Sequence, residues 1–291
     1  MIQSLDPRQI RRAFSRAAPV YAATAVLQAE VRARLLERLD YVERPPARIL
    51  DLGCGPGQAA RRLKQRWPAA EVVAIDLALP MLREARRELR PFRRFARVCA
   101  DVRALPVAEA SCDVLFSSLC FQWIDALPAL LAELRRVLRP DGMLLFSTFG
   151  QGTLAELRAA FEAADPGQPH VSRFAHIQQI GDALLEAGFR DPVLDSDRFV
   201  LTYPHARDLM LDLRAIGAVN ALAGRRRALT GPRRMQRVFE AYEAFRRDGR
   251  LPASYEVVYA HAWGPRPGQP RRVGGTEVVS FPVSALRRRR A

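Results

Sequence analysis

Three aspartates in the first half of the chain each follow a short apolar run that predicts a buried β-strand. Asp51 ends the run "ARILD", Asp76 ends "VVAID", and Asp101 comes directly after "FARVCA". Because the carboxyl ends of parallel strands meet at one edge of a sheet, we expect the three carboxylates to face one cleft. Taken singly, each aspartate would more often cap a helix or lie in a solvated loop. Taken together, they predict a nucleotide site.

The turn after the first aspartate, "DLGCGPGQAA", matches the G-x-G-x-x-A pattern of dinucleotide-binding turns. Gly53, Gly55 and Gly57 would let a ligand approach the backbone closely. Asp51 disfavours a pyrophosphate at this turn, because two negative charges in a partly dry cleft repel each other. A ligand with a cationic amino group and no phosphate avoids that repulsion. The pattern therefore predicts a site for S-adenosyl-L-methionine.

The other acids fit the remaining parts of this ligand. Asp76 ends the second strand, where an acid accepts hydrogen bonds from both ribose hydroxyls in open α/β folds. Asp101 would accept a hydrogen bond from the adenine amino group, and Val102 would donate its backbone N–H to the adenine. Ser117, in the strand-like run "CDVLFSSL", completes the predicted cofactor-binding set.

Strand-like and helix-like segments alternate between residues 48 and 150, which predicts a parallel sheet with helices on both faces. The N-terminal stretch has apolar residues at helical spacing and is interrupted at Pro19, so we expect two helices there. After Gly150, helical stretches precede strand-like segments around "DSDRFVLTY" and "YEVVYAHAWG". From Gly264 on, Gly, Pro and Arg predominate, and we expect a loose tail with one short β segment near Val278.

These segments carry a resemblance to a known family. "DLGCGPG", "AID", "CADVRALP", "SSLCFQWIDALP" and "ELRRVLRPDGMLLFSTFG" are similar to class I S-adenosylmethionine-dependent methyltransferases. More narrowly, the chain from Arg11 to Trp263 resembles the malonyl-acyl-carrier-protein O-methyltransferases of biotin biosynthesis. That resemblance lies in "AFSRAAPVYAATAVLQ", "STFGQGTLAELRAAF", "PHVSRF", "LRAIGAVNALAGRRRALTG" and "LPASYEVVYAHAWG". Two positions depart from the family pattern: Ser118 stands where many members have Asn, and Arg214 where many have Lys.

The resemblance implies a doubly wound, mostly parallel seven-stranded sheet of the Rossmann-like class I methyltransferase type. It also implies a methyl transfer from S-adenosyl-L-methionine to the free carboxylate of a malonyl thioester carried by acyl carrier protein. The implied organisation has four parts: an N-terminal helical lid (1–43), a cofactor-binding core (44–150), a completion of the sheet with helical substrate-cap insertions (151–263) and a basic tail (264–291).

An in-line transfer to a carboxylate needs no general base, because the acceptor is already ionised at pH 7. The free carboxylate of the acceptor does need a cationic partner. Arg173 and Arg214 are the candidates, because they lie in segments that would cover the pocket. Tyr21 lies on the predicted lid, where it would contact the ligands or pack in the core. Gln122 and Trp123 follow the fourth strand, where acceptors bind in related enzymes. These five residues are the substrate-binding candidates.

Composition limits the partners and the compartment. The formal net charge is +15, and the stretch from Arg225 to the C-terminus holds sixteen arginines against five acidic residues. A basic surface would suit an acidic carrier protein, with Arg225–Arg227, Arg233, Arg234 and Arg237 as its predicted dock. A GC-rich genome would produce the same bias. The four cysteines form no CxxC pair and the chain has four histidines, so we expect no metal site and a cytoplasmic location.

Other activities fit the same core. One is a protein-arginine hydroxylase related to complex I assembly factors, and another is an RNA-directed methyltransferase suggested by the charge alone. No RNA-binding module is recognisable, so we do not expect nucleic acid as a partner. No apolar run approaches the ~20 residues that span a bilayer, so we expect no membrane partner. A regulator that binds the cofactor without catalysis would need the same three aspartates.

Overall fold

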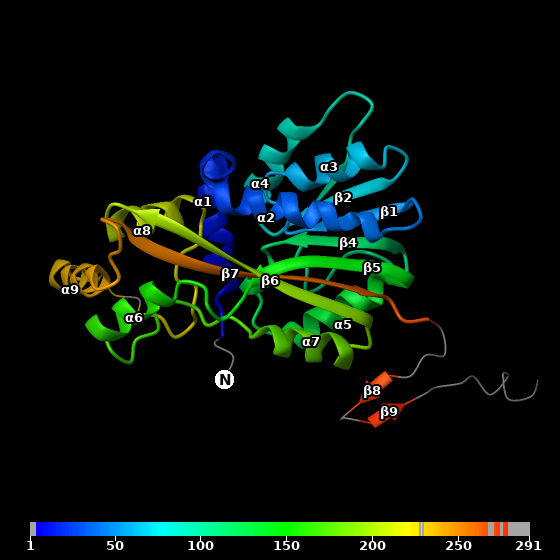
Figure 1. Cartoon of the computed structure of the whole chain (residues 1–291). Helices are drawn as coiled ribbons and strands as arrows, with labels where there is room; N and C mark the ends of the chain where they lie inside the picture. Colours follow the sequence, from blue (N-terminus) through cyan, green and yellow to red (C-terminus); the bar gives the residue numbers. More distant parts are fainter. Residues whose placement is uncertain (1–3, 227, 229, 267–270, 274–275, 279–291) are drawn as a thin grey trace, which may run out of the picture.

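Seven strands form one sheet in the computed structural model, which describes residues 4–226, 228, 230–266, 271–273 and 276–278. The strands are β1 (Arg48–Leu52), β2 (Glu71–Asp76), β3 (Ala96–Cys99), β4 (Cys112–Ser118), β5 (Leu138–Phe149), β6 (Arg190–Tyr203) and β7 (Leu251–Trp263). Their order across the sheet is β3-β2-β1-β4-β5-β7-β6 (Figure 1). The pairs among β1 to β5 are parallel, and β7 runs antiparallel to both β5 and β6. The prediction of a mostly parallel, seven-stranded, doubly wound sheet is confirmed.

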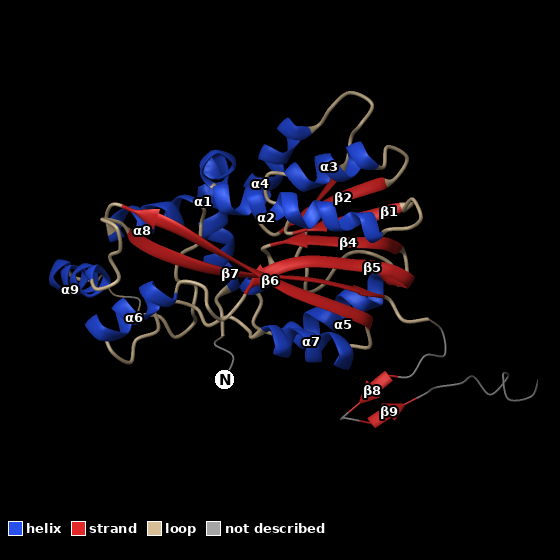
Figure 2. Cartoon of the chain, viewed as in Figure 1, coloured by secondary structure: helices blue, strands red, loops and turns tan. Residues whose placement is uncertain are grey.

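Helices cover both faces of this sheet (Figure 2). One core cluster joins the sheet to α2 (Val26–Glu37) and α3 (Gln58–Arg66), and a second joins it to α5 (Leu127–Val137) and α7 (Ile177–Glu186). Because both faces are covered, the central strands contain continuous apolar runs instead of an alternating pattern, as in "VLF" of β4. The sheet therefore keeps only its strand ends open to a ligand.

The N-terminal segment forms two helices, as predicted, but they meet at a different residue. α1 (Pro7–Thr24) runs through Pro19, and the break falls at Ala25, whose φ of −81° and ψ of 59° leave the helical region. Proline inside a helix removes one backbone hydrogen bond. Here Ala13, Ala17 and Ala18 are buried along the same helix, and this packing outweighs the loss.

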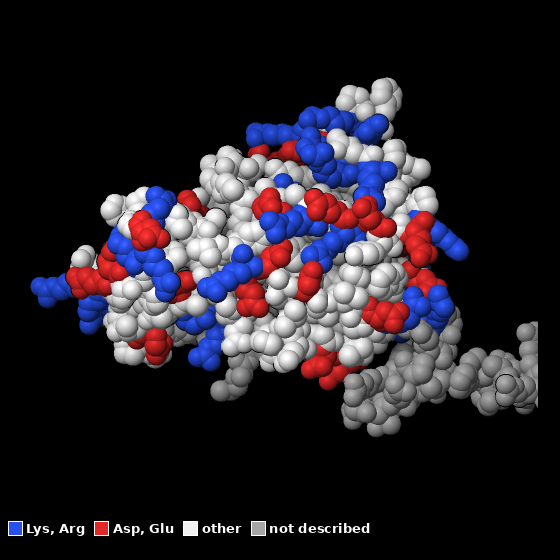
Figure 3. Space-filling model, viewed as in Figure 1, with Lys and Arg blue, Asp and Glu red and all other residues white. Residues whose placement is uncertain are grey.

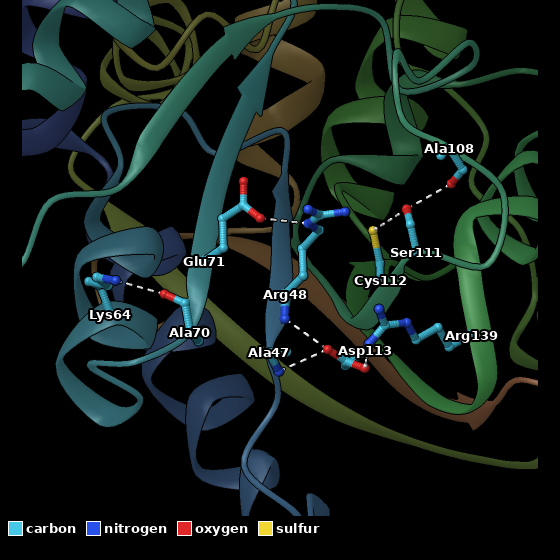
Figure 4. Close-up of polar contacts among 10 residues, drawn as sticks. All are labelled: Ala47, Arg48, Lys64, Ala70, Glu71, Ala108, Ser111, Cys112, Asp113 and Arg139. Atoms are coloured by element: carbon cyan, nitrogen blue, oxygen red, sulfur yellow. Dashed lines mark hydrogen bonds and ion pairs between the residues drawn. The ribbon is translucent and has the colours of Figure 1, made fainter.

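The strand ends opposite the three aspartates are joined by a network of polar contacts (Figure 4). The Asp113 carboxylate of β4 accepts hydrogen bonds from the backbone N–H groups of Ala47 (2.8 Å) and Arg48 (2.7 Å), and it pairs with Arg139 of β5 at 2.7 Å. Arg48 also pairs with Glu71 of β2 at 2.7 Å. These contacts join the amino-terminal ends of four neighbouring strands, which sets the register that aligns their carboxyl ends.

The C-terminal half extends the sheet beyond its parallel part. β6 and β7 run together past the other strands, and α6 (Ala155–Ala164), α8 (Ala206–Ala215) and α9 (Pro232–Glu243) lie at their far end (Figure 1). The segment near Val278 contains two short strands instead of one, β8 (Arg271–Val273) paired with β9 (Thr276–Val278). Residues 279–291 of the predicted basic tail lie outside the described residues. Among the helices that the structure describes, none has the length and hydropathy to cross a bilayer.

Candidate functional site

A cavity lies at the carboxyl ends of the central strands, as predicted. Five of the predicted cofactor residues line it, namely Gly53, Gly55, Asp76, Asp101 and Val102. α1 (Pro7–Thr24) and the segment before it also line the cavity, with Leu5, Pro7, Ile10, Phe14 and Tyr21. We call this space the cofactor cavity.

The glycines of the turn serve different purposes. Gly53 has φ +68°, and a Cβ on it would lie 2.4 Å from the Cys120 Sγ. A Cβ on Gly57 (φ +77°) would lie 2.7 Å from the Ala85 Cβ, so this glycine permits α3 to pack against α4 (Leu79–Ala85) and does not line the cavity. At Gly55 the nearest atom is 4.0 Å away, so this is the position where a ligand gains room from a missing side chain.

Asp76 is held in the cavity wall by the backbone. Its Oδ2 accepts a hydrogen bond from the Gly55 N–H (2.9 Å) and its Oδ1 accepts one from the Ala78 N–H (2.8 Å). Burial raises the pKa of this carboxyl to about 6, and the two backbone hydrogen bonds oppose that rise. The carboxylate is thus fixed at the end of β2 with both oxygens near the glycine turn.

Asp51 lies behind the glycine turn and does not line the cavity. It is 1% exposed, and its Oδ2 has no hydrogen-bond partner among the described residues. Burial raises its pKa to about 7, while the Ala60 backbone N–H and the Arg32 guanidinium act in the opposite direction. A buried carboxyl oxygen without a partner is costly, so the site is suited to a ligand that brings a cationic donor.

Asp101 forms an ion pair that the sequence analysis missed. Arg103 places its Nη2 2.5 Å from Asp101 Oδ2 and its Nε 3.0 Å from Oδ1. These hydrogen bonds lower the pKa of the Asp101 carboxyl. Arg103 also lines the cofactor cavity. The spacing of acid and base two residues apart in "DVR" was the signal available for this pair.

Ser117 does not occupy the predicted position. Its side chain is fully buried, and its Oγ donates a hydrogen bond to the Leu52 carbonyl at 2.9 Å, joining β4 to β1. Neighbouring residues of a strand point to opposite faces, and the next residue, Ser118, lines the cavity instead. The expectation that Ser117 contacts the cofactor is therefore corrected.

A second, largely apolar cavity adjoins the first. Phe14, Tyr21, Leu119 and Trp123 line both spaces, so they form a shared wall. Gln122 lines the second cavity as well, so three of the five substrate candidates are brought together there. We call this space the acceptor cavity. Among its described lining residues none is Asp, Glu, Lys or Arg.

The two predicted arginines lie outside this cavity. Arg173 is exposed and lines a neighbouring cavity with Phe174 and Gln122. Arg214 is exposed on α8 and lines neither that cavity, nor the cofactor cavity, nor the acceptor cavity. His170 lines the acceptor cavity in their place.

His170 is held by two neighbours. Its Nε2 lies 2.9 Å from Asp165 Oδ2, and its ring stacks on Phe161 with centroids 4.2 Å apart. Asp165 is 8% exposed, and the hydrogen bond to His170 is the largest of the effects that lower its pKa. The imidazole is thus fixed in the cavity wall beside a negative charge.

Comparison with known proteins agrees with this geometry. A family model described as "Methyltransferase domain" matches residues 50–146. A malonyl-[acyl-carrier protein] O-methyltransferase from Xylella fastidiosa is 51% identical over 98% of this chain and 97% of its own length. The enzyme of the same name from Halorhodospira halophila is 50% identical over 99% of this chain and 98% of its own length.

Solved structures share the fold at low identity. A putative methyltransferase from Bacillus halodurans has a TM-score of 0.57 at 18% identity and covers 81% of this chain and 99% of its own. Phosphoethanolamine N-methyltransferase 2 from Haemonchus contortus, solved with S-adenosyl-L-methionine, has a TM-score of 0.51 at 19% identity, covering 80% of this chain and 53% of its own. Given its near-full-length relatives, the chain belongs to the malonyl-[acyl-carrier protein] O-methyltransferase family.

Proposed function

We propose that this chain transfers a methyl group from S-adenosyl-L-methionine to the free carboxylate of a malonyl group carried as a thioester on acyl carrier protein, giving the methyl ester that starts biotin synthesis. The observation that carries the proposal is the shared wall of Phe14, Tyr21, Leu119 and Trp123, across which the cofactor cavity meets an apolar acceptor cavity. The names of the relatives identify the acceptor.

The described residues fit the cofactor part by part. Asp76 would accept from the ribose hydroxyls, and Asp101 with the Val102 backbone would hold the adenine. The orphaned Oδ2 of Asp51 fits the methionyl ammonium group. When bound, the cofactor supplies an electrophilic methyl group on a sulfonium, and the protein has only to place an acceptor in line with it.

Arg32 of α2 fits the methionyl carboxylate, although no sequence pattern singled it out. Its guanidinium is half-buried and forms no hydrogen bond or ion pair with any residue that the structure describes. Burial lowers the pKa of the Arg32 guanidinium, and the Tyr21 and Asp51 side chains are the main groups that raise it in opposition. Arg32 also shares a groove with Gln58, the first residue of α3. An amino-acid head group with one charge of each sign suits a site between Asp51 and Arg32.

In the acceptor cavity, apolar side chains exclude water and no base is required, because the attacking carboxylate is already ionised. We assign the contact with that carboxylate to His170, whose imidazole ring is held in place by the 2.9 Å contact between its Nε2 and Asp165 Oδ2. Gln122 and Tyr21 would position the rest of the acyl group. Arg173, in the adjoining cavity, stays a second candidate; Arg214 is no longer one.

The test is transfer of a labelled methyl group to a panel of acceptors. Malonyl-carrier protein should acquire label that mild alkali releases as methanol, the mark of a methyl ester. Acetyl-carrier protein is the matched control, because it lacks only the free carboxylate and should stay unlabelled. Label on bulk tRNA, or a hydroxylated protein without methyl transfer, would contradict the proposal. The four cysteines are unpaired, which supports our placing the reaction in the reducing cytoplasm.

A further inference from the structure

The two segments that wall the cavities are joined to each other at the surface. The Asp6 N–H donates to the Ala221 carbonyl (2.7 Å) and the Ala223 N–H donates to the Ser4 carbonyl (2.9 Å). Residues 5–14 line the cofactor cavity on their inner side, and residues 218–220 line the acceptor cavity. The outer side of this paired structure is therefore a surface close to both ligands.

That outer side is basic. Arg8 and Arg12 of α1, together with Arg225 and Arg226, line a surface concavity whose only acidic member among the described residues is Asp6. We call it the arginine concavity. Many other arginines of the protein are interspersed with acids, as over α9, although a further basic group covers α3 and α4 (Figure 3). Four arginines against one aspartate leave this concavity with an excess of three positive charges.

The arginines of the concavity are held in different ways. Arg225 is fixed, because its Nη2 lies 3.1 Å from Asp6 Oδ2 and its Nη1 donates to the Leu222 carbonyl at 2.9 Å. Arg8 and Arg12 are exposed and form no ion pair with any residue in the described part of the chain. The concavity thus has a rigid base and two arginines available to an anionic partner.

Asp165 connects this surface with the acceptor cavity. Its Oδ1 lies 3.4 Å from the Arg226 Nη2 and 3.4 Å from the Arg234 Nε, while its Oδ2 contacts His170 in the cavity wall. One buried carboxylate therefore separates the basic surface from the residue to which we assign the substrate carboxylate. A protein bound at this surface would be placed next to the acceptor cavity.

We propose that the arginine concavity docks an acidic helix of the acyl carrier protein, and this inference rests on the proposed function. Acyl carrier proteins are small and acidic, so their charge complements the concavity. Such attraction acts mainly on the association rate and is screened beyond about 8 Å at physiological salt. The sequence analysis placed the dock at residues 225–237; the structure adds Arg8 and Arg12 of α1, whereas Arg227 lies outside the described residues.

The test variant is Arg8→Glu with Arg12→Glu. Both side chains are exposed, and acidic residues are tolerated in the first turns of a helix. Arg226 and Arg234 are left unchanged, because they hold Asp165 and a change there would disturb His170. The matched control is Arg83→Glu with Arg86→Glu, the same change of charge at exposed positions outside the concavity. A neutral pair, Arg8→Gln with Arg12→Gln, provides a milder second variant.

The measurements are steady-state kinetics with malonyl-carrier protein, malonyl-coenzyme A and malonyl-pantetheine. The charge-reversed variant should raise the KM for the carrier-protein substrate about ten- to a hundredfold, the scale of electrostatic steering. It should leave both small substrates within about twofold, and its KM should depend less on salt. The neutral pair should show a smaller effect in the same direction, and the control pair should match the wild type.

Three results would overturn the inference. An unchanged KM for malonyl-carrier protein in both variants would show that the partner docks elsewhere. Equal loss with malonyl-coenzyme A would identify a phosphate site instead of a protein dock. Loss on malonyl-pantetheine as well would mean that the concavity shapes the acceptor cavity itself. If the wild-type protein methylates no malonyl-carrier protein at all, the proposed function fails first, and that outcome is distinguishable from all three.

Discussion

Replacing Asp51 with Asn tests whether its buried carboxyl receives the cationic amino group of the cofactor. Burial raises the pKa of the Asp51 carboxyl to about 7, from an ordinary value of 3.8. The folded protein therefore holds this proton more tightly than the unfolded chain does. The contribution of Asp51 to stability falls as the pH rises from about 4 to about 7 and is constant above that. In the ligand-free protein, an ionised Asp51 is consequently destabilising.

The size of this destabilisation follows from the rise of the Asp51 pKa from 3.8 to about 7, because a tenfold change in a protonation equilibrium corresponds to about 1.4 kcal/mol. Asp51→Asn should thus increase the free energy of unfolding of the ligand-free protein by up to about 4 kcal/mol at pH 8 and by almost nothing near pH 4. The affinity for a ligand with an ammonium group should instead increase as the pH rises. With a pKa of about 7, the ionised fraction rises from about a tenth at pH 6 to about nine tenths at pH 8. If only the ionised form binds an ammonium group, affinity rises about tenfold over that interval.

The assay is calorimetry with S-adenosylhomocysteine between pH 6 and pH 8, together with denaturant unfolding of the ligand-free protein. Binding at pH 7 should release about half a proton, seen by comparing buffers of different ionisation enthalpy. Asp51→Asn should abolish most of the tenfold rise and this proton release. Asp76 has its own pKa of about 6, so a smaller rise at the acidic end should persist in the variant. A variant no more stable than the wild type at pH 8, or one with an unchanged pH dependence of binding, would refute the reasoning.

Three further substitutions separate the roles in the site. Asp76→Ala should weaken binding of S-adenosylhomocysteine by about 1–3 kcal/mol through lost charged hydrogen bonds, and unchanged affinity in a folded variant would remove the ribose assignment. Arg32→Met should lower the affinity for S-adenosylhomocysteine about tenfold, the effect of losing one charge-assisted hydrogen bond. The affinity for 5′-methylthioadenosine, which lacks the carboxylate, should not change. Equal loss of affinity for both ligands would count against a carboxylate contact. His170→Asn should raise the KM for malonyl thioesters at least about tenfold with cofactor affinity intact. Near-normal activity of that variant, together with a strong loss of activity in Arg173→Met, would assign the contact with the substrate carboxylate to Arg173 in the adjoining cavity.

The cofactor half of the site was predictable because its residues are set by local sequence. Gly53 and Gly55 lie in the turn directly after β1, and Asp76 ends β2, the next strand along the chain. The parallel register aligns Asp76 with the end of β3. The errors in this half are also local. Ser117 and Ser118 are adjacent, and the sequence did not show which of the two faces the cavity. Asp51 was expected to face the ligand directly but lies behind the turn, with its Oδ2 unpartnered.

The acceptor half depends on contacts between distant parts of the chain, and there a family pattern was a weaker guide than helix geometry. Ala206 and Leu209 of α8 are buried and Leu213 is half-buried, so these three positions define the inward face of that helix. Arg214 follows Leu213 by one residue, a rotation of about 100°, which carries it away from that face and into solvent. The periodicity of "ARDLMLDLRA" could have excluded Arg214 from the pocket. No comparable rule could have found His170, because it lies in an irregular segment after α6. Its position depends on contacts with Phe161 and Asp165 at the end of α6, and on the hydrogen bond that Asn220 donates to the Pro169 carbonyl at 2.9 Å. In our proposal the recognition of the substrate carboxylate therefore depends on tertiary packing, and variants at Asn220 should affect malonyl turnover through His170 and leave cofactor binding unchanged.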